Sequence, residues 1–229
     1  MRPLGKRAQG IAVLASGGLD SCVMLAELAK FSEPVYPIYV RCGLFWEETE
    51  LRFLRDFVST VGDPRILEPR SLEFPMDDIY SGQWQTTGTG IPGYYEADER
   101  WEIPGRNLIL ISKTAVWCKL HDVGQIGLGT LGSNPFSDAT PEFFASLGKA
   151  LSMGLDLGLE IICPFAELTK PDVIRLGSHL PLERTLSCAS PQESRHCGVC
   201  GKCHERTDAF LHAGVKDPTA YASEPPTRA

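Results

Sequence analysis

The segment from Ile11 to Ala29 limits the possible folds more than any other part of this sequence. The aliphatic run Ile11 to Ala15 predicts a buried strand, and Leu19 to Ala29, which holds neither glycine nor proline, predicts a buried helix. The turn between them contains Gly17 and Gly18. A buried strand that leads through a short glycine turn into a buried helix is typical of a parallel sheet with helices on its faces.

The rest of the chain alternates in the same way. Further strands are predicted at 35–40, 65–67, 124–129 and 159–163, and helices at 46–61, 107–120, from Pro141 onward and at 170–178. Thr140 and Thr169 are the expected N-caps of the last two helices. We therefore expect an α/β fold with a doubly wound parallel sheet. The glycine- and proline-rich stretch from Ser81 to Pro104 is predicted to be a long loop that becomes ordered when a ligand binds.

The string Ser16-Gly17-Gly18-Leu19-Asp20-Ser21 has the composition of a phosphate-binding loop. Glycines let the backbone approach a phosphate closely, and a helix N-terminus offers N–H groups and a positive dipole end. The serine hydroxyls are further donors, and Asp20 is either a ligand of Mg²⁺ or a helix cap. The string matches neither the Walker pattern nor the dinucleotide fingerprint. A serine-capped glycine turn without a ligand is the alternative.

Eight cysteines divide into two groups of four. Cys188, Cys197, Cys200 and Cys203 crowd one segment, with gaps of eight, two and two residues, which predicts a tetrahedral zinc site. A closed shell of four thiolates predicts a structural metal. An iron–sulfur cluster is the rival interpretation, and His196 and His204 are alternative ligands. The scattered cysteines are interpreted as small buried hydrophobes; these are Cys22, Cys42, Cys118 and Cys163.

The composition of the chain argues against nucleic acid and membranes as binding partners. Of the 229 residues, 22 are basic and 29 acidic, a net charge of −7, which argues against tight non-specific binding to nucleic acid. No apolar run is long enough for a membrane span, and residues 1–9 lead into no signal-peptide-type stretch, so a cytoplasmic location is expected. The predicted organisation is an α/β domain over 1–184, a zinc-binding segment over 185–214 packed on it, and a frayed tail over 215–229.

The loop at 16–21 resembles the pyrophosphate loop (PP-loop) of the N-type ATP pyrophosphatases. Farther along the chain follow Ile103-Pro104-Gly105-Arg106-Asn107 and then the four clustered cysteines. This combination, which spans Ile11 to Phe210, resembles the 7-cyano-7-deazaguanine synthase (QueC) family. The resemblance implies that residues 1–184 are an ATP-binding synthetase domain with the PP-loop fold, of the adenine nucleotide alpha hydrolase-like type, with a small C-terminal zinc-binding appendage. It also implies a homodimer.

The resemblance implies a ligase reaction on a small molecule. ATP adenylates the carboxylate of 7-carboxy-7-deazaguanine, and ammonia displaces AMP to give an amide. A second activation by ATP dehydrates the amide to a nitrile, which enters queuosine or archaeosine synthesis. Since the sequence contains no glutaminase segment, ammonia has to come from free ammonium or from a partner.

The resemblance also implies roles for particular residues. The loop would hold ATP and Mg²⁺ through Ala15, Ser16, Gly17, Gly18, Leu19, Asp20 and Ser21. Substrate contacts would come from Arg106, Asn107, Phe136 and Asp138, with the Asp138 carboxylate on the deazaguanine edge. Asp20, Lys170 and Arg106 would be catalytic, and Lys170 would reach the phosphates. The alternatives are a salt bridge for Arg106, a helix cap for Asn107 and a solvated surface position for Lys170.

Two strings depart from the family pattern. Arg41 to Trp46 stands where the family carries Asp-Tyr-Gly-Gln-Arg-His, and only the glycine is shared. Phe136 to Thr140 stands in place of Tyr-Pro-Asp-Cys-Arg, and only the aspartate is shared. Three alternatives follow: a related PP-loop ligase that acts on another carboxylate or on a protein, a tRNA-modifying PP-loop enzyme, or a non-catalytic nucleotide-binding module.

Overall fold

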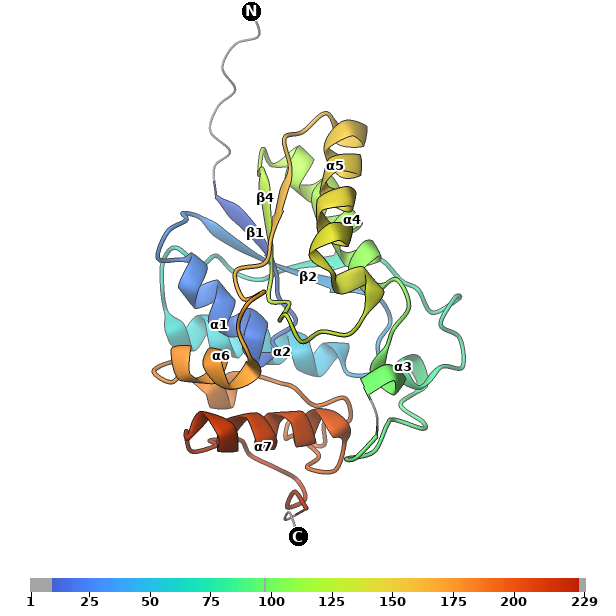
Figure 1. The fold of residues 1–229 in the computed structure, drawn as a ribbon, viewed down its shortest axis with the longest axis vertical. Helices are drawn as coiled ribbons and strands as arrows, with labels where there is room; N and C mark the ends of the chain where they lie inside the picture. Colours follow the sequence, from blue (N-terminus) through green and yellow to red (C-terminus); the bar gives the residue numbers. More distant parts are fainter. Residues whose placement is uncertain (1–9, 97, 227–229) are drawn as a thin grey trace, which may run out of the picture.

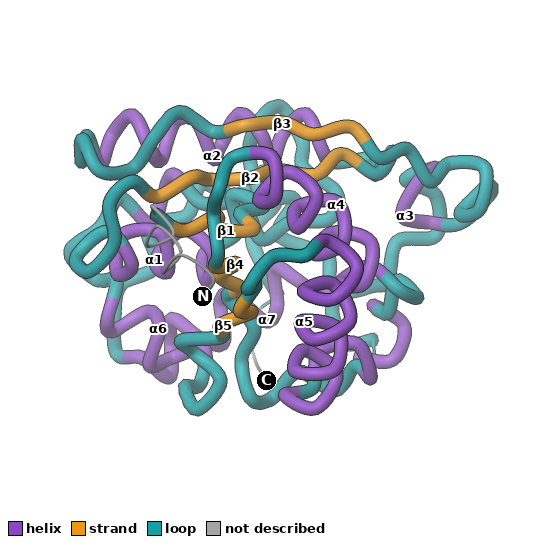
Figure 2. The backbone as a smooth tube through the Cα atoms, turned by 90° about the horizontal axis from the view of Figure 1, so that it is seen from above, coloured by secondary structure: helices purple, strands orange, loops and turns teal. Residues whose placement is uncertain are grey.

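The sheet is parallel throughout. A computed structural model (Figure 1) describes residues 10–96 and 98–226, and its five strands lie in the order β3-β2-β1-β4-β5 (Figure 2). Their bounds are β1 Ile11–Leu14, β2 Val35–Arg41, β3 Arg70–Glu73, β4 Gln125–Leu128 and β5 Glu160–Ile162. Every neighbouring pair is parallel. The doubly wound α/β fold expected from the sequence is confirmed.

Helices cover both faces of the sheet (Figure 2). On one face lie α4 Arg106–Leu120 and α5 Pro141–Leu155; on the other lie α1 Leu19–Leu28, α2 Glu47–Val61 and α6 Lys170–Leu176. A further helix, α7 Gly201–Ala213, packs against α6. Short helical turns are α3 Trp84–Thr87, η1 Asp98–Trp101, η2 Ser137–Ala139 and η3 Leu182–Arg184.

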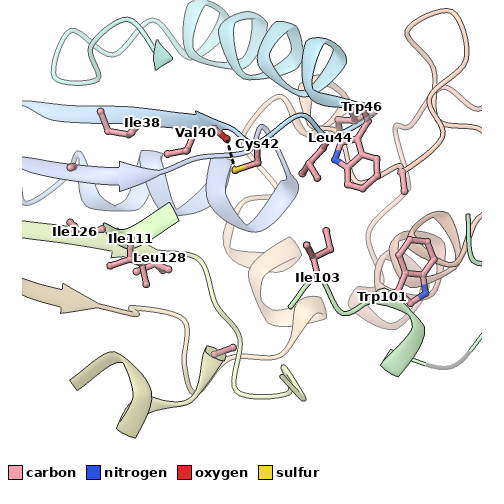
Figure 3. Packing of buried hydrophobic residues seen from close by; sticks show 14 of the residues in the cluster. Ile38, Val40, Cys42, Leu44, Trp46, Trp101, Ile103, Ile111, Ile126 and Leu128 are labelled. Atoms are coloured by element: carbon pink, nitrogen blue, oxygen red, sulfur yellow. Dashed lines mark hydrogen bonds between the residues drawn. The ribbon is translucent and has the colours of Figure 1, made fainter. Parts of the chain in front are cut away.

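Successive side chains of the central strand β1 point to opposite faces of the sheet and belong to two separate parts of the core. Ile11 and Val13 of β1 pack with α1, α2 and α6, whereas Ala12 packs with the residues under α4 and α5. Because both faces of the sheet are covered, β1 is apolar at every position. Figure 3 shows part of the α4 side of the core, which continues past the arrowheads of the strands to Trp46 and Trp101.

The two predicted threonine caps are confirmed. Thr140 accepts a hydrogen bond from the N–H of Phe143 at 3.2 Å, and Pro141 occupies the first turn of α5. Thr169 and Asp172 cap α6 reciprocally. These side chains satisfy backbone donors that the first turn of a helix leaves without an intrahelical partner.

The third strand and the last helix differ from the sequence prediction, and the predicted loop at 81–104 contains the short turns α3 and η1. Around 65–67 the structure has a single bridge between Val35 and Ile66, and the third strand is instead β3 at Arg70–Glu73. Pro69 lies between them and lacks the N–H that a continuous strand ladder requires. Helix α7 was not predicted, because the cysteine spacing was interpreted as a series of turns around a metal.

The C-terminal tail also differs from the expected frayed segment. Up to residue 226 it is described, and it pairs with the cysteine-rich segment through Ala222 N–H to His196 O (2.7 Å) and Ser223 N–H to Cys197 O (3.2 Å). Gly198, at φ +83°, makes room for this pairing: a Cβ there would lie 1.9 Å from Ser223 O. The predicted division at residues 184 and 214 stays a prediction, and residues 1–9 and 227–229 lie outside the described part.

Among the described helices, none is both long and apolar enough to cross a membrane.

Candidate active site

A cavity of about 560 Å³ opens at the carboxyl ends of β1, β2 and β4. The strand order reverses between β1 and β4, which is where open α/β sheets bind ligands. The cavity gathers most of the residues that the sequence singled out: Ala15, Ser16, Gly18, Leu19, Asp20, Ser21, Arg106, Asn107, Phe136 and Lys170. Gly17 and Asp138 do not line it.

The glycine loop connects β1 to α1. Gly17 has φ +75°, and a Cβ there would lie 2.6 Å from the carbonyl oxygen of Glu50 in α2. Glycine is therefore required for the loop to pass α2, and its contribution is conformational. The Ser16 hydroxyl accepts the N–H of Gly18 at 3.3 Å, and the Ser21 hydroxyl donates to the Gly18 carbonyl at 3.0 Å. No described side chain caps α1. The N–H groups of its first turn are therefore left without a side-chain acceptor at the end of the helix that borders the cavity.

A chain of alternating charges crosses the cavity beside this loop. Lys170 Nζ lies 2.6 Å from Asp20 Oδ2 and 3.1 Å from Glu205 Oε1. Lys202 Nζ lies 2.9 Å from Glu205 Oε2. Lys170 is 17% exposed, so it is not the solvated surface residue of the alternative interpretation. The glycine loop, α6 and α7 thus meet through four side chains.

Burial and pairing act in opposite directions on these charges. Burial raises the pKa of Asp20, and the charge of Lys170 opposes that shift. For Lys170, burial favours the neutral amine, but Asp20 and Glu205 outweigh it and the net pKa is raised. Lys170 therefore carries its positive charge at neutral pH. Asp20 Oδ1 is buried, and none of the described residues hydrogen-bonds to it. A cation bound at this oxygen would satisfy it.

Arg106 and Asn107 begin helix α4 at the mouth of the cavity. Gly105 precedes them at φ +73°, and the Tyr80 hydroxyl donates to the Pro104 carbonyl at 2.7 Å, which anchors the turn. Within the described chain, no carboxylate forms an ion pair with Arg106, so its guanidinium is available to a ligand.

Asp138 holds Asn107 and lies outside the cavity lining. Its Oδ2 accepts the backbone N–H of Asn107 at 2.9 Å, and its Oδ1 accepts from Asn107 Nδ2 at 3.1 Å. The carboxylate thus caps the first turn of α4 through Oδ2 and holds the Asn107 side chain through Oδ1, whereas the sequence interpretation gave it to the substrate edge. Phe136 does line the cavity. The roles of all these residues toward a ligand stay predictions.

The clustered cysteines form a group that can hold a metal ion. The Sγ atoms of Cys188, Cys197, Cys200 and Cys203 all lie within 4.8 Å of one another. Backbone N–H groups of Ser190 and Cys197 donate to Cys188 Sγ at 3.3 and 3.2 Å, as expected around a metal-bound thiolate. Of the other cysteines, Cys22, Cys42 and Cys118 are buried as predicted, and Cys163 is partly buried.

Neither flanking histidine belongs to this group. His196 Nε2 accepts the N–H of Ser187 at 3.1 Å, and the ring of His204 stacks on Tyr94 with a centroid separation of 4.4 Å. Burial lowers the pKa of His196 to about 3, so its ring is neutral near pH 7. Both rings therefore have structural partners other than a metal.

The cavity and the cysteine group share a wall. Cys188 lines the cavity, and α7, which starts directly after Cys200, carries Lys202 and Glu205 into it. The long segment between 81 and 104 joins the same wall, because Gly93 bridges Cys200. A metal in the cysteine group would therefore hold two charged residues of the cavity in place.

Comparison with known proteins agrees with this arrangement. The family model described as "Queuosine biosynthesis protein QueC" matches residues 10–214. The chain belongs to the QueC family. A 7-cyano-7-deazaguanine synthase of Methanospirillum hungatei is 32% identical over 223 residues, which cover 91% of this chain and 97% of that protein. The synthase of Methanothermobacter thermautotrophicus is 29% identical over 221 residues, with the same coverage.

Solved structures support the fold of this QueC-family chain. A predicted subunit of tRNA methyltransferase from Methanocaldococcus jannaschii has a TM-score of 0.53 at 13% identity, and covers 91% of this chain and 89% of its own. The U34-tRNA thiolase NcsA from Methanococcus maripaludis, with its [4Fe-4S] cluster, also has a TM-score of 0.53, at 15% identity over 93% of this chain and 70% of its own. At such identities the likeness concerns the fold alone.

Several cavity residues of this QueC-family member were missed by sequence reasoning. They are Tyr39, Glu50, Trp46, Trp84, Trp101, Lys202 and Glu205. Glu50 lies in an amphipathic helix among other acidic residues, where nothing in the pattern separates a buried glutamate from an exposed one. The tryptophans come from three segments that only the fold brings together. Lys202 and Glu205 lie on the helix that was not predicted.

Glu50 has the most unusual surroundings of these residues. It is 8% exposed, and its Oε2 accepts a hydrogen bond from the Tyr39 hydroxyl at 2.7 Å. Burial raises the pKa of Glu50 to about 7, although the charge of Arg106 and the hydrogen bond from Tyr39 favour the carboxylate. Both forms of this group are therefore accessible near neutral pH.

Proposed function

We propose that this chain is an ATP-dependent ligase that converts 7-carboxy-7-deazaguanine to 7-cyano-7-deazaguanine with ammonia as the nitrogen source. Membership of the QueC family and the names of its relatives support this function. The observation that carries it is the meeting of the glycine loop, Lys170 and Arg106 in one cavity at the carboxyl edge of the sheet.

ATP with Mg²⁺ would occupy the loop end of the cavity. Ser16, Gly18, Leu19 and Ser21 surround the N-terminus of α1, where a phosphate meets backbone N–H groups and a positive dipole end. The buried, unpartnered Oδ1 of Asp20 suits a hard cation such as Mg²⁺. Bound Mg²⁺ would offset the negative charge that develops on the departing pyrophosphate.

The remaining steps use charges that the chain itself supplies. Lys170 stays protonated and brings a positive charge to the phosphates, and Arg106, without a carboxylate partner, can hold the carboxylate of the acid. The acid oxygen attacks the α-phosphorus and pyrophosphate leaves; ammonia then displaces AMP. Activation of the amide oxygen by a second ATP lets AMP leave again as the nitrile forms. The tryptophans around the cavity would limit the access of water to the acyl adenylate.

Zinc is the metal proposed for the cysteine group. Three of its Sγ···Sγ separations are 3.9, 3.9 and 3.6 Å. Zinc–sulfur bonds of ~2.3 Å in a tetrahedron require sulfurs ~3.8 Å apart. In an iron–sulfur cluster the four cysteines are divided among two or four irons, and sulfurs on different irons would lie farther apart than in a zinc site. Four thiolates leave no open position, so this zinc would be structural.

Product analysis tests the function. Zinc-loaded protein is incubated with ATP, Mg²⁺, ammonium and 7-carboxy-7-deazaguanine, and the products are analysed by mass spectrometry and AMP release. We expect the nitrile, with two AMP for each nitrile formed. AMP release without any amide or nitrile would sink the substrate assignment, and the absence of both would sink the ligase.

A ligase acting on another carboxylate, or on a protein, is the second candidate. Trp46 and Phe136 both line the cavity, and both belong to the strings that depart from the family pattern. AMP release from a panel of purine-like carboxylates separates this candidate from the first. A tRNA-modifying activity is opposed by the net charge of −7. A gel shift with tRNA at low salt would revive it.

A homodimer and a cytoplasmic location belong to the proposal as well. The dimer rests on the family resemblance, and light scattering coupled to size exclusion checks it. A monomer at micromolar concentration would contradict it. Fractionation of the native host with an antibody to the chain checks the location.

A further inference from the structure

Two carboxylates compete for the heterocycle of the acid substrate. Asp138 is the one that the family resemblance favours, but both of its oxygens are occupied by Asn107 and it does not line the cavity. Glu50 lines the cavity, and its Oε2 accepts a hydrogen bond from the Tyr39 hydroxyl. Glu50 is therefore the carboxylate in a position to meet a ligand.

Glu50 is built into its position. Tyr39, which is 3% exposed, directs its hydroxyl at Oε2 of Glu50, and Trp46 also donates to this carboxyl group. The backbone carbonyl of Glu50 packs against Gly17 of the glycine loop. A carboxylate can accept more hydrogen bonds than these two donors supply, and Glu50 lines the cavity, so acceptor capacity is left for a ligand there.

Three tryptophans stand around the same end of the cavity. Trp46 and Trp84 are stacked with ring centroids 5.6 Å apart and planes inclined by 18°, and Trp101 meets Trp84 edge-on at 5.3 Å. Figure 3 shows Trp46 and Trp101 beyond the arrowheads of the strands. Flat aromatic faces beside a buried acceptor suit a planar nitrogen heterocycle, which stacks on a ring and donates from its edge.

We propose that Glu50 is the specificity-determining residue for the acid, and that its carboxylate accepts the two neighbouring N–H donors of a guanine-like edge while the tryptophans contact the ring faces. This inference rests on the proposed function, since it concerns the substrate of the same site. Tyr39 is a positioning residue, because it acts by holding Glu50. The ring N–H and exocyclic amine of a 7-deazaguanine form such a donor pair.

The adenine of ATP is the other planar heterocycle in the reaction, and its edge differs. It offers one N–H donor beside a ring-nitrogen acceptor. A glutamine at position 50 could still accept one bond and donate another, so it would match adenine. The glutamine side chain cannot accept two neighbouring donors, because its amide NH₂ would face one of the N–H groups of the guanine-like edge. Glu50→Gln therefore separates the two sources of a heterocycle.

The experiment compares two acids on the wild type and on Glu50→Gln. One is 7-carboxy-7-deazaguanine, and the other is its analogue without the exocyclic amine. For each we would measure KM and kcat of AMP release, and the Kd of the acid without ATP by calorimetry. We expect the wild type to prefer the amine-bearing acid by roughly 10- to 100-fold, the range of one good bidentate contact. Glu50→Gln should abolish this preference and leave the KM for ATP unchanged.

Controls distinguish recognition from folding. Glu68→Gln removes the charge of an exposed glutamate outside the cavity and should leave both acids as in the wild type. Tyr39→Phe keeps Glu50 but removes its donor, and should weaken the preference without abolishing it. If Glu50→Gln does not fold, as judged by circular dichroism, Tyr39→Phe and the two-acid comparison on the wild type still decide the matter.

Each outcome bears on one proposal. A wild type that turns over neither acid overturns the proposed function. A wild type that turns over both equally overturns the inference alone, as does a Glu50→Gln protein that keeps the preference. A selective rise in the KM for ATP in that variant would also overturn it, because it would show that Glu50 serves the adenine.

Discussion

The two ends of the cavity are built in different ways. The end proposed for the phosphates (the phosphate end) is dominated by one contiguous string, residues 15–21, which connects a strand to a helix. The end proposed for the acid (the heterocycle end) is assembled from single side chains of β2, α2, α3 and η1. The first end is set by local backbone geometry and the second by packing, so a side-chain substitution at the second can leave the backbone of residues 15–21 in place.

Their electrostatics differ as well. At the phosphate end, Asp20, Lys170, Glu205 and Lys202 neutralise one another in sequence. At the heterocycle end Glu50 lines the cavity beside Tyr39 and aromatic rings, and the charges of Arg106 and the buried Glu47 act on it. A chain of paired charges suits a highly charged ligand such as ATP, whereas a buried acceptor beside aromatic rings suits selection among neutral ring edges.

The largest effect is expected from loss of the cysteine group, because this group shares a wall with the cavity and its loss would affect both ends. Cys200→Ser should lose the bound metal and lower the free energy of unfolding by ~4 kcal/mol or more, because binding of a structural metal contributes directly to folding. Metal analysis and thermal melting check this. Cys163→Ser, outside the cluster and partly buried, is the matched control and should keep its metal. Stoichiometric zinc with an unchanged Tm in Cys200→Ser would contradict the role of the cluster.

Lys170→Met should break the phosphate end alone. Loss of a charge aimed at the phosphates is expected to slow AMP formation by about 10²- to 10³-fold, while the Kd of the acid measured without ATP stays the same. Single-turnover AMP release and calorimetry provide the two readouts. Lys149→Met, an exposed lysine on α5, is the control. An effect of less than about threefold on AMP formation would place Lys170 outside the chemistry.

Glu50 should make the stability of the fold depend on pH. Its ordinary pKa of 4.5 is raised to about 7 in the folded protein. Between these values the folded state binds the proton and the unfolded chain does not, so the stabilisation is complete below pH 4.5 and is lost as pH rises to 7. A shift from 4.5 to about 7 corresponds to about 3 kcal/mol. The groups that face Glu50 are Tyr39, Trp46, Arg106 and Glu47.

Denaturant titrations between pH 4.5 and 8 check this dependence. Glu50→Gln should remove that part of the slope, and Glu68→Gln should not. Equal slopes in the wild type and in Glu50→Gln would show that the Glu50 carboxyl is ionised in the folded protein between pH 4.5 and 8. Water would then reach this carboxyl more freely than its burial indicates.

Trp84→Ala should produce the smallest of these effects. One stacking partner for a base is worth ~1–3 kcal/mol, so the Kd for the acid should rise about tenfold, with the KM for ATP unchanged. Trp84→Phe keeps an aromatic face and should lose much less. Equal losses for acid and ATP would mean that the tryptophans serve the cavity as a whole, and the distinction between its two ends would fail.

The sequence was informative wherever function depends on neighbours along the chain. Asp20 and the glycine loop lie next to each other in sequence and remain next to each other in the cavity. The four cysteines fall within sixteen positions, so their spacing alone predicted a metal site. The caps at Thr140 and Thr169 were also predictable, because capping is a contact over three residues. The tail pairing with 196–197 was not, because it joins distant backbone groups.

Local order therefore determined the α/β class, the glycine loop between β1 and α1, and the cysteine group in this protein. Only the tertiary structure decided that Asp138 caps α4, that Glu50 is buried beside Tyr39, and that α7 brings Lys202 and Glu205 to Lys170. The physical reason is that burial and pairing come from segments brought together by packing. A glutamate on an amphipathic helix fits the same sequence pattern whether its side chain faces water or a cavity.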